Sequence, residues 1–214
     1  MFIIDFDNTL FNTTGPNGSR ELCLKNLAEI GVNEKVYQES YNIARNTFEG
    51  LASYNYERHA EAISQFGFDK EKVLQILNKT AEPEVLQSLL LSGAIDLLEN
   101  LKKTDQPVVL LSLGDPEYQY LKFRGTGIEK YFDRVFMTNK PKKEIMEEIF
   151  SFVSDKKYWF INDRIDETLE LKKIYPELKI ILKVGPHYPI EDYQATSLPY
   201  FKTLTEIKDY ILNQ

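Results

Sequence analysis

The sequence predicts an α/β fold: a Rossmann-like, mainly parallel sheet with helices on both faces, and an all-helical domain inserted after the first strand. In the second half of the 214-residue chain, short apolar runs alternate with helical patterns, which is typical of parallel strands joined by helical crossovers. Before that region, about 65 residues show helical spacing without a convincing strand. We therefore expect an α/β core domain at residues 1–14 and 89–214, and a helical cap domain at residues 15–88.

The chain opens on an expected strand at residues 2–7, which read FIIDFD, and residues 8–18 are rich in turn formers. In the inserted segment, apolar and aromatic side chains recur at helical spacing and predict a small helical bundle. The residues that mark its four expected helices are Cys23, Leu27 and Ile30, then Tyr37, Tyr41, Ala44 and Phe48, then Tyr56, Ala60 and Ile63, and finally Val73, Ile76 and Leu77.

A further helix is expected after Pro83, with Leu91, Ile95 and Leu98 on one face. Residues 107–113 read PVVLLSL, an apolar run typical of a strand that is buried on both sides. The later elements are expected as a helix after Pro116, a strand at 135–138, a helix from near Lys143, a strand at 158–161, a helix across Leu169 and Leu171, a strand at 179–184 and a closing helix with Ile207, Tyr210 and Ile211.

Composition and charge exclude several classes of protein. With 26 basic and 33 acidic residues and a net charge of −7, we expect no binding to nucleic acid polymers or to anionic membranes. A small anionic substrate remains compatible, because a local field can oppose the net charge. The single cysteine, Cys23, excludes an internal disulfide. No apolar run has membrane-spanning length and no signal peptide is evident, so a cytoplasmic location is expected.

Polar side chains with a common chemistry lie where the expected strands end. Asp5 and Asp7 have the i, i+2 spacing that points both carboxylates the same way from an extended backbone. Ser112, Lys140 and Asp163 end or follow the next three strands, and ligands of open α/β sheets bind beyond the carboxyl ends of the strands. Carboxylates, a hydroxyl and an amine in this arrangement are the components of a magnesium-assisted phosphoryl-transfer site.

These motifs resemble, in order, the four motifs of the haloacid dehalogenase (HAD) superfamily, in the branch with a helical cap after the first strand. DFDNT at residues 5–9 resembles its D-x-D-x-T motif, and Ser112 at the end of PVVLLS resembles the second motif. Lys140 in NKPKKEIM resembles the lysine motif, and NDRIDE at residues 162–167 resembles the acidic fourth motif. Residues 118–136 also resemble the linking segment of nucleotidase-like and phosphoglycolate-phosphatase-like members.

The resemblance implies a role for each matched residue. Asp5 would be the nucleophile that forms an aspartyl phosphate, and Asp7 would protonate the leaving oxygen and then activate water. Thr9 would orient Asp7. The remaining implied roles are binding of the phosphoryl group by Thr9, Ser112 and Lys140, coordination of Mg²⁺ by Asp5, the backbone carbonyl of Asp7 and Asp163, and retention of metal-bound water by Glu167.

The resemblance thus implies a Mg²⁺-dependent phosphatase that hydrolyses a small phosphomonoester, of the nucleoside monophosphate or sugar phosphate class. Cleavage of a carbon–halogen bond needs no acid for the leaving group, so Asp7 favours a phosphorylated metabolite over a haloacid as partner. Two alternatives stay open: a phosphomutase of the same family, and a catalytically silent binding or regulatory module. The sequence makes no prediction of the oligomeric state.

The fourth motif departs from the family pattern. Asn162 stands where glycine is usual, and Arg164 follows the metal-binding aspartate where a small residue is common. We expect Arg164 to pair with Asp166. Because the acid four residues after Asp163 is Glu167 rather than aspartate, Asp166 stays an alternative for the role given to Glu167.

The lysine motif also leaves alternatives. The segment before Lys140 is shorter than usual, so Lys142 or Lys143 could supply the amine at the site instead. In the helical insertion, His59 and Arg45 are expected on a solvated face rather than in contact with substrate.

Overall fold

The computed structural model describes residues 1–45, 53–152 and 157–214. Its central feature is a parallel sheet in the order β3-β2-β1-β4-β5-β6. Because β1 pairs with β2 on one side and β4 on the other, the chain segment after β1 leaves the middle of the sheet. The strands are β1 (Phe2–Ile4), β2 (Val108–Leu113), β3 (Arg134–Thr138), β4 (Trp159–Asn162), β5 (Lys179–Lys183) and β6 (Tyr200–Phe201).

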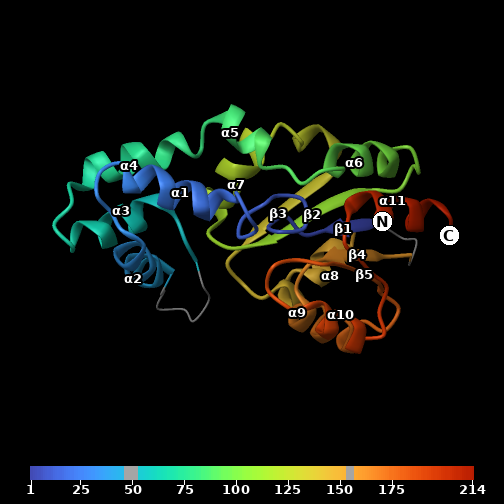
Figure 1. Ribbon diagram of the computed structural model, residues 1–214. Coiled ribbons are helices and arrows are strands. Elements are labelled where there is room, and N and C mark those ends of the chain that lie inside the picture. Colours follow the sequence, from blue (N-terminus) through green and yellow to red (C-terminus); the bar gives the residue numbers. More distant parts are fainter. Residues whose placement is uncertain (46–52, 153–156) are drawn as a thin grey trace.

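Helices cover both faces of the sheet (Figure 1). Ile4 and Leu110 contribute to the core on one face, whereas Ile3 and Val109 contribute to the core on the other. This alternation follows from the period of two along a strand, and burial on both faces explains why these strands are apolar throughout. The first core is closed by α6 (Ala94–Lys102) and α11 (Leu204–Leu212), and the second by α8 (Met146–Phe150), α9 (Ile165–Ile174) and α10 (Ile190–Ala195). The α/β fold class is confirmed.

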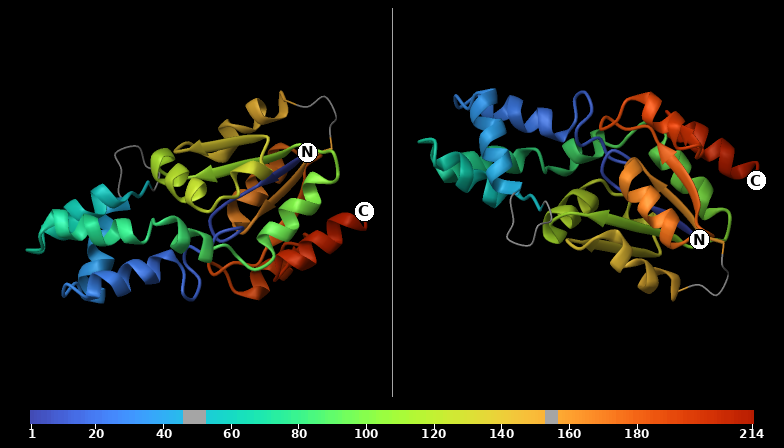
Figure 2. Two further views of the ribbon diagram at one scale, coloured as in Figure 1. Left: turned by 90° about the horizontal axis from the view of Figure 1, so that it is seen from above. Right: turned by 90° about the horizontal axis from the view of Figure 1, so that it is seen from below.

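Four helices between β1 and β2 form a bundle with a hydrophobic core of its own, which includes Leu27, Ala60, Ile63 and Leu77. We refer to them as the α1–α4 bundle. Figure 2 shows this bundle beside the sheet, at the end toward which the strands run. Its members are α1 (Ser19–Ala28), α2 (Glu34–Arg45), α3 (Tyr56–Ser64) and α4 (Lys70–Lys79), at the positions that the helical spacing predicts. Phe48, which the spacing assigns to the second of these helices, lies outside the described residues.

The expected single helix after Pro83 is wrong. The structure has two helices here, α5 (Pro83–Ser88) and α6, separated by Gly93 with a φ of 85°. Helix α5 ends at Ser88, and Gly93, whose left-handed conformation suits glycine, directly precedes the first residue of α6. As a result Ile95 is 47% exposed instead of facing the core with Leu98.

The first strand is also shorter than expected, because it ends at Ile4 and not at residue 7. Helix α10 and strand β6 are elements that the periodicity did not predict, and both are short. None of the helices within the described residues has the length and apolar character needed to span a membrane.

Candidate active site

Asp5 directly follows β1 and is buried, with 5% of its surface exposed. The Nζ atom of Lys142 lies 2.6 Å from Asp5 Oδ1 and 2.9 Å from Glu167 Oε2. Burial raises the pKa of Asp5, and Lys142 opposes this shift. Burial alone would lower the pKa of Lys142, but the charges of Asp5 and Glu167 raise it, so the amine stays an ammonium ion. Asp5 is therefore a buried carboxylate with a fixed cation beside it.

The lysine beside Asp5 is Lys142 and not Lys140, which corrects the expectation from the lysine motif. Lys140 is exposed, whereas the Lys142 side chain is 3% exposed. A turn of 3₁₀ helix at Lys142–Glu144 begins directly after Pro141. Lys142 is the first residue of this turn, and its side chain reaches back to the end of β1. Because the segment after β3 is short, the lysine that reaches Asp5 stands two residues later in the sequence than the motif predicts.

Thr9 contacts Asp5 rather than Asp7. Its hydroxyl donates a hydrogen bond to Asp5 Oδ2 at 2.9 Å, because the chain turns back after β1 and the Thr9 N–H donates to the carbonyl of Phe6 at 3.3 Å. The expectation that Thr9 orients Asp7 is therefore wrong, and the hydroxyl that donates to Asp7 belongs to Thr13.

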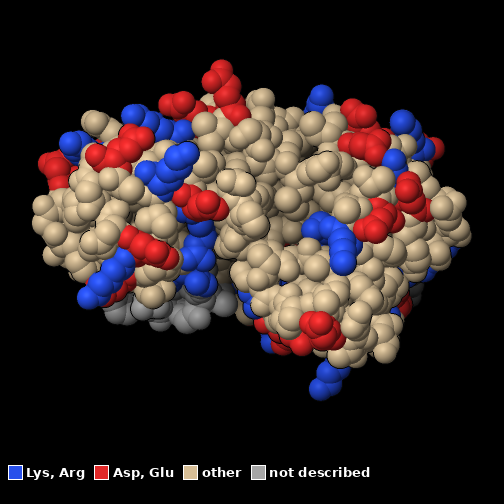
Figure 3. All heavy atoms as spheres, viewed as in Figure 1, with Lys and Arg blue, Asp and Glu red and all other residues tan. Residues whose placement is uncertain are grey.

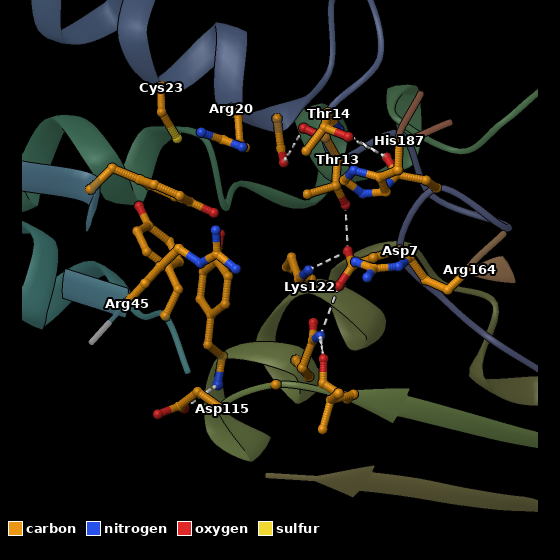
Figure 4. A pocket seen from close by; sticks show the side chains of 18 of the residues that line it. Asp7, Thr13, Thr14, Arg20, Cys23, Arg45, Asp115, Lys122, Arg164 and His187 are labelled. Carbon is orange, nitrogen blue, oxygen red and sulfur yellow. Dashed lines mark hydrogen bonds and ion pairs between the residues drawn. The ribbon is translucent and has the colours of Figure 1, made fainter. Parts of the chain in front are cut away.

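A second lysine, Lys122, forms an ion pair with Asp7. Lys122 Nζ lies 2.5 Å from Asp7 Oδ1, and Gln119 Nε2 donates to Asp7 Oδ2 at 2.7 Å (Figure 4). Burial alone would raise the pKa of Asp7, but Lys122 and the hydrogen bonds lower it overall. Both partners come from α7 (Pro116–Gly125), where a spacing of three residues places them on one face. Sequence reasoning missed Lys122 and Gln119, although that spacing directly after β2 was a usable signal.

Two buried polar atoms at the strand ends have no hydrogen-bond partner within the part of the chain that the structure describes: Ser112 Oγ and Asp163 Oδ2. Both residues are 1% exposed, and Asp163 directly follows β4. Buried polar atoms are almost always paired, so each of these atoms marks a place where a ligand atom can bind. Burial, with the negative charge of Asp5, raises the pKa of Asp163 to about 8. Gly185 leaves room here, because a Cβ atom on it would lie 2.8 Å from Asp163 Oδ2.

The donor set fits a magnesium ion by its chemistry. Mg²⁺ takes oxygen ligands, commonly one or two carboxylates with several waters and substrate oxygens. Asp163 offers an unpaired carboxylate oxygen, and Asp5 offers a carboxylate whose oxygens can accept further contacts. In residues 1–45, 53–152 and 157–214 no group of three or more histidine, cysteine, aspartate or glutamate side chains could hold a metal by itself.

The remaining residues of the fourth motif separate into two groups. Glu167 turns inward to Lys142, and although burial alone would raise its pKa, Lys142 lowers it. Asp166 turns outward and pairs with Arg164 at 2.8 Å, as expected, on a side chain that is 58% exposed. Of the two acids, the one that lies beside the Asp5 site is Glu167.

A cavity of about 190 Å³ lies between the α1–α4 bundle and the carboxyl ends of the strands. Asp7, Gly114 and Lys122 line it from the sheet side, and Arg20 and Tyr41 line it from the bundle (Figure 4). The cavity therefore opens onto the predicted acid–base residue and is bounded on the other side by the bundle.

The bundle contacts α7 through the ring of Tyr118, which packs against Tyr54 and Tyr56, and through one carboxylate. Asp115 caps the start of α7 by accepting a hydrogen bond from the Tyr118 N–H at 3.1 Å. From the bundle, Arg58 Nη2 lies 3.0 Å from Asp115 Oδ2, and Asn55 Nδ2 donates to the same oxygen at 3.1 Å. Asp115 also lines the cavity, so these contacts lie at its edge.

His59 does not lie on a solvated face, so that expectation is wrong. The side chain is fully buried, and its ring hydrogen-bonds with Ser40 Oγ at 3.1 Å and with Tyr54 Oη at 2.7 Å. Burial lowers its pKa to about 4. It is a neutral residue of the bundle core. Arg45 is exposed as expected, yet it also lines the cavity.

No protein-family model and no curated protein matches the sequence. Solved structures do match. A haloacid dehalogenase-like hydrolase from Burkholderia xenovorans has a TM-score of 0.75 at 19% identity, over 97% of this chain and 94% of that one. A magnesium-bound HAD hydrolase from Bacillus subtilis has a TM-score of 0.64 at 18% identity, over 100% and 98% of the two chains. The L-2-haloacid dehalogenase from Xanthobacter autotrophicus has a TM-score of 0.63 at 13% identity, over 100% and 98%.

The structural neighbours are thus HAD-superfamily hydrolases, which confirms the resemblance at the level of the fold. They include hydrolases that differ in the bond they cleave. At these identities the likeness reports the fold alone, and the chemistry has to be argued from the side chains of this chain.

Proposed function

We propose that this protein is a Mg²⁺-dependent phosphatase that hydrolyses a small phosphomonoester through an aspartyl phosphate on Asp5. The observation that carries the proposal is the buried Asp5–Lys142 pair at 2.6 Å, at the same sheet edge as the unpartnered Ser112 hydroxyl and Asp163 carboxylate. A carboxylate nucleophile, a fixed cation and open polar positions are what transfer of a phosphoryl group requires.

In the first step, an Asp5 carboxylate oxygen attacks phosphorus while the bond between phosphorus and the leaving oxygen breaks. Lys142 stays charged next to Asp5 and stabilises the negative charge of the transferring group. Ser112 donates its hydroxyl to a phosphoryl oxygen, which satisfies an atom that is otherwise buried without a partner. Thr9 holds the second oxygen of Asp5 and so fixes the direction of attack.

Asp7 and Lys122 supply the proton that the leaving oxygen takes up. The ammonium of Lys122 lies 2.5 Å from Asp7 Oδ1, so the proton that Asp7 passes to the leaving oxygen comes from this ammonium, and the pair lacks one proton until the second step. In the second step, water attacks phosphorus, its proton goes to the Asp7–Lys122 pair, and the bond between phosphorus and Asp5 breaks. Phosphate leaves, and both Asp5 and the pair return to their starting state.

The metal in this proposal is Mg²⁺, which would be held by Asp5, Asp163 and the backbone carbonyl of Asp7. When bound, it neutralises charge on the phosphoryl oxygens. Glu167, whose Oε2 lies 2.9 Å from Lys142 Nζ, would keep metal-bound water in place. The α1–α4 bundle acts as a cap that excludes water and selects the leaving group.

The test is phosphate release from p-nitrophenyl phosphate and from a panel of phosphorylated metabolites, with and without Mg²⁺, using Asp5→Asn as the control. Mg²⁺-dependent release that the Asp5→Asn variant lacks supports the proposal. Accumulation of a bisphosphate without phosphate release assigns a mutase instead. Halide release from 2-haloacids without phosphatase activity assigns a dehalogenase, and the absence of all turnover favours a binding module.

A further inference from the structure

Two arginines from the α1–α4 bundle converge on one aromatic ring in the cavity. The guanidinium carbon of Arg20, on α1, lies 4.0 Å from the centre of the Tyr41 ring, and that of Arg45, at the end of α2, lies 5.5 Å from the same centre. Figure 4 shows both guanidinium groups turned toward the interior of the cavity. Tyr41 thus holds two positive charges close together on the side opposite Asp7.

The other cations that line the cavity are compensated. Lys122 pairs with Asp7 at 2.5 Å, and Arg164 pairs with Asp166 at 2.8 Å. In contrast, the described residues contain no carboxylate in an ion pair with Arg20 or Arg45. The cavity therefore carries an excess of positive charge on the bundle side.

The positive charges of these arginines also act on the loop after β5. His187 lies in this loop and lines the cavity. Burial lowers the pKa of His187, and the positive charges of Arg164, Arg20 and Arg45 lower it further. The charges of three guanidinium groups, which belong to separate parts of the chain, thus act on His187 in the cavity wall. In the space-filling view, basic side chains gather along the boundary between the bundle and the rest of the molecule (Figure 3).

From this geometry we propose that the leaving group of the substrate carries a second anionic group, a carboxylate or a phosphate, which Arg20 and Arg45 bind. The inference rests on the proposed phosphatase function and specifies its substrate class. Guanidinium groups match the planar geometry of carboxylate and phosphate and bind them through paired hydrogen bonds. The second anion would supply the counter-charge that Arg20 and Arg45 lack among the described residues.

The size of the cavity restricts the class of substrate further. Pockets for drug-sized ligands measure roughly 300–1,000 Å³, whereas this cavity measures about 190 Å³. The leaving group is therefore compact. A phosphorylated hydroxy acid or a small sugar bisphosphate fits better than a nucleoside monophosphate, whose base would need additional volume.

The experiment compares kcat/KM within matched pairs of substrates. The first pair is 3-phosphoglycerate and glycerol 3-phosphate, in which a carboxylate replaces a hydroxymethyl group. The second pair is fructose 1,6-bisphosphate and fructose 6-phosphate, which differ by one phosphate. We expect the more anionic member of at least one pair to be preferred, and the pair that shows the preference identifies the anion as carboxylate or phosphate.

Variants then connect the preference to the arginines. Arg20→Gln and Arg45→Gln are each expected to lower kcat/KM for the anionic substrate about 10- to 100-fold, the range for a hydrogen bond to a charged group, and to leave p-nitrophenyl phosphate turnover within about twofold. Arg124→Gln is the matched control, because Arg124 also stacks on a tyrosine, Tyr120, at 5.2 Å but lines no part of this cavity. Arg20→Lys should restore part of the loss.

Equal kcat/KM within both pairs, or equal losses for charged and uncharged leaving groups in Arg20→Gln, would overturn the inference. Calorimetric binding of the same four compounds to the wild-type protein and to Arg20→Gln provides a readout that needs no turnover. If nothing is hydrolysed but the anionic compounds bind more tightly and lose this advantage in Arg20→Gln, the proposed phosphatase function fails and the anion site stands. If the binding shows no such difference, the anion site fails, whatever the phosphatase assay gives.

Discussion

Replacing Lys142 by methionine tests the central pair of the site. The substitution keeps a long unbranched side chain but removes the ammonium that lies 2.6 Å from Asp5 and 2.9 Å from Glu167. Lys140→Met is the matched control, since the same change two residues away affects an exposed side chain. The two variants separate the lysine that the motif predicts from the lysine that the structure places at Asp5.

The expected magnitudes follow from burial. Removing one partner of a buried ion pair costs about 3–5 kcal/mol of stability, and the Lys142 side chain is 3% exposed. A surface substitution usually changes stability by less than about 0.5 kcal/mol, which is the expectation for Lys140→Met. Loss of a preorganised group that stabilises the transition state lowers kcat about 10²- to 10³-fold, so Lys142→Met should retain at most about one hundredth of the activity.

The pH dependence of activity provides an independent test of the Asp5–Lys142 pair. Lys142 opposes the rise that burial causes in the pKa of Asp5, so its removal raises that pKa further. The protonated form of Asp5 is not a nucleophile, and the acid limb of the activity profile should therefore move to higher pH in Lys142→Met.

Urea denaturation measures the stability of both variants, and p-nitrophenyl phosphate turnover between pH 5 and pH 9 measures the activity. If Lys140→Met loses activity while Lys142→Met keeps both stability and turnover, the assignment of the site lysine is refuted. If both variants retain wild-type turnover, a role for any amine beside Asp5 is excluded.

Three further predictions concern other parts of the site. Because burial and Asp5 raise the pKa of Asp163 from 3.8 to about 8, the metal-free folded state binds more protons than the unfolded state between these values. Its stability should fall as pH rises through that window, by at most about 1.4 kcal/mol per pH unit. Asp163→Asn should reduce this slope in urea titrations, and Mg²⁺ should raise the melting temperature more at pH 8 than at pH 6, because its ligand must lose a proton. Ser112→Ala removes a buried hydroxyl without a partner, so we expect unchanged or higher stability but a KM for p-nitrophenyl phosphate raised about tenfold, the loss of one hydrogen bond; an unchanged KM would contradict phosphoryl binding by Ser112. Arg58→Met removes the ion pair that joins the bundle to Asp115 at 3.0 Å, and it should raise KM while leaving the melting temperature within a few degrees, so an unchanged KM would argue against a role in closure.

Local patterns in the sequence were enough to predict most of the fold. The apolar runs that became β2, β4 and β5 are buried on both faces of the sheet, and a strand in that position must be apolar throughout. Helical spacing located all four helices of the α1–α4 bundle. The break at Gly93 was missed, because its φ of 85° depends on how the chain packs between Leu10 and α11 and not on periodicity.

The sequence by itself determined that Asp5, Ser112 and Asp163 stand at or next to the ends of strands, because each follows an apolar run that a buried strand requires, although the exact end of β1 was not predicted. Only the tertiary structure decided that Lys142 and not Lys140 reaches Asp5, and that Lys122 of α7 holds Asp7. A lysine side chain is long and flexible, so its position depends on the turn that carries it and on the charges it meets across the fold. The partners of these carboxylates lie more than 100 residues away in the chain, a distance over which spacing and propensity carry no information.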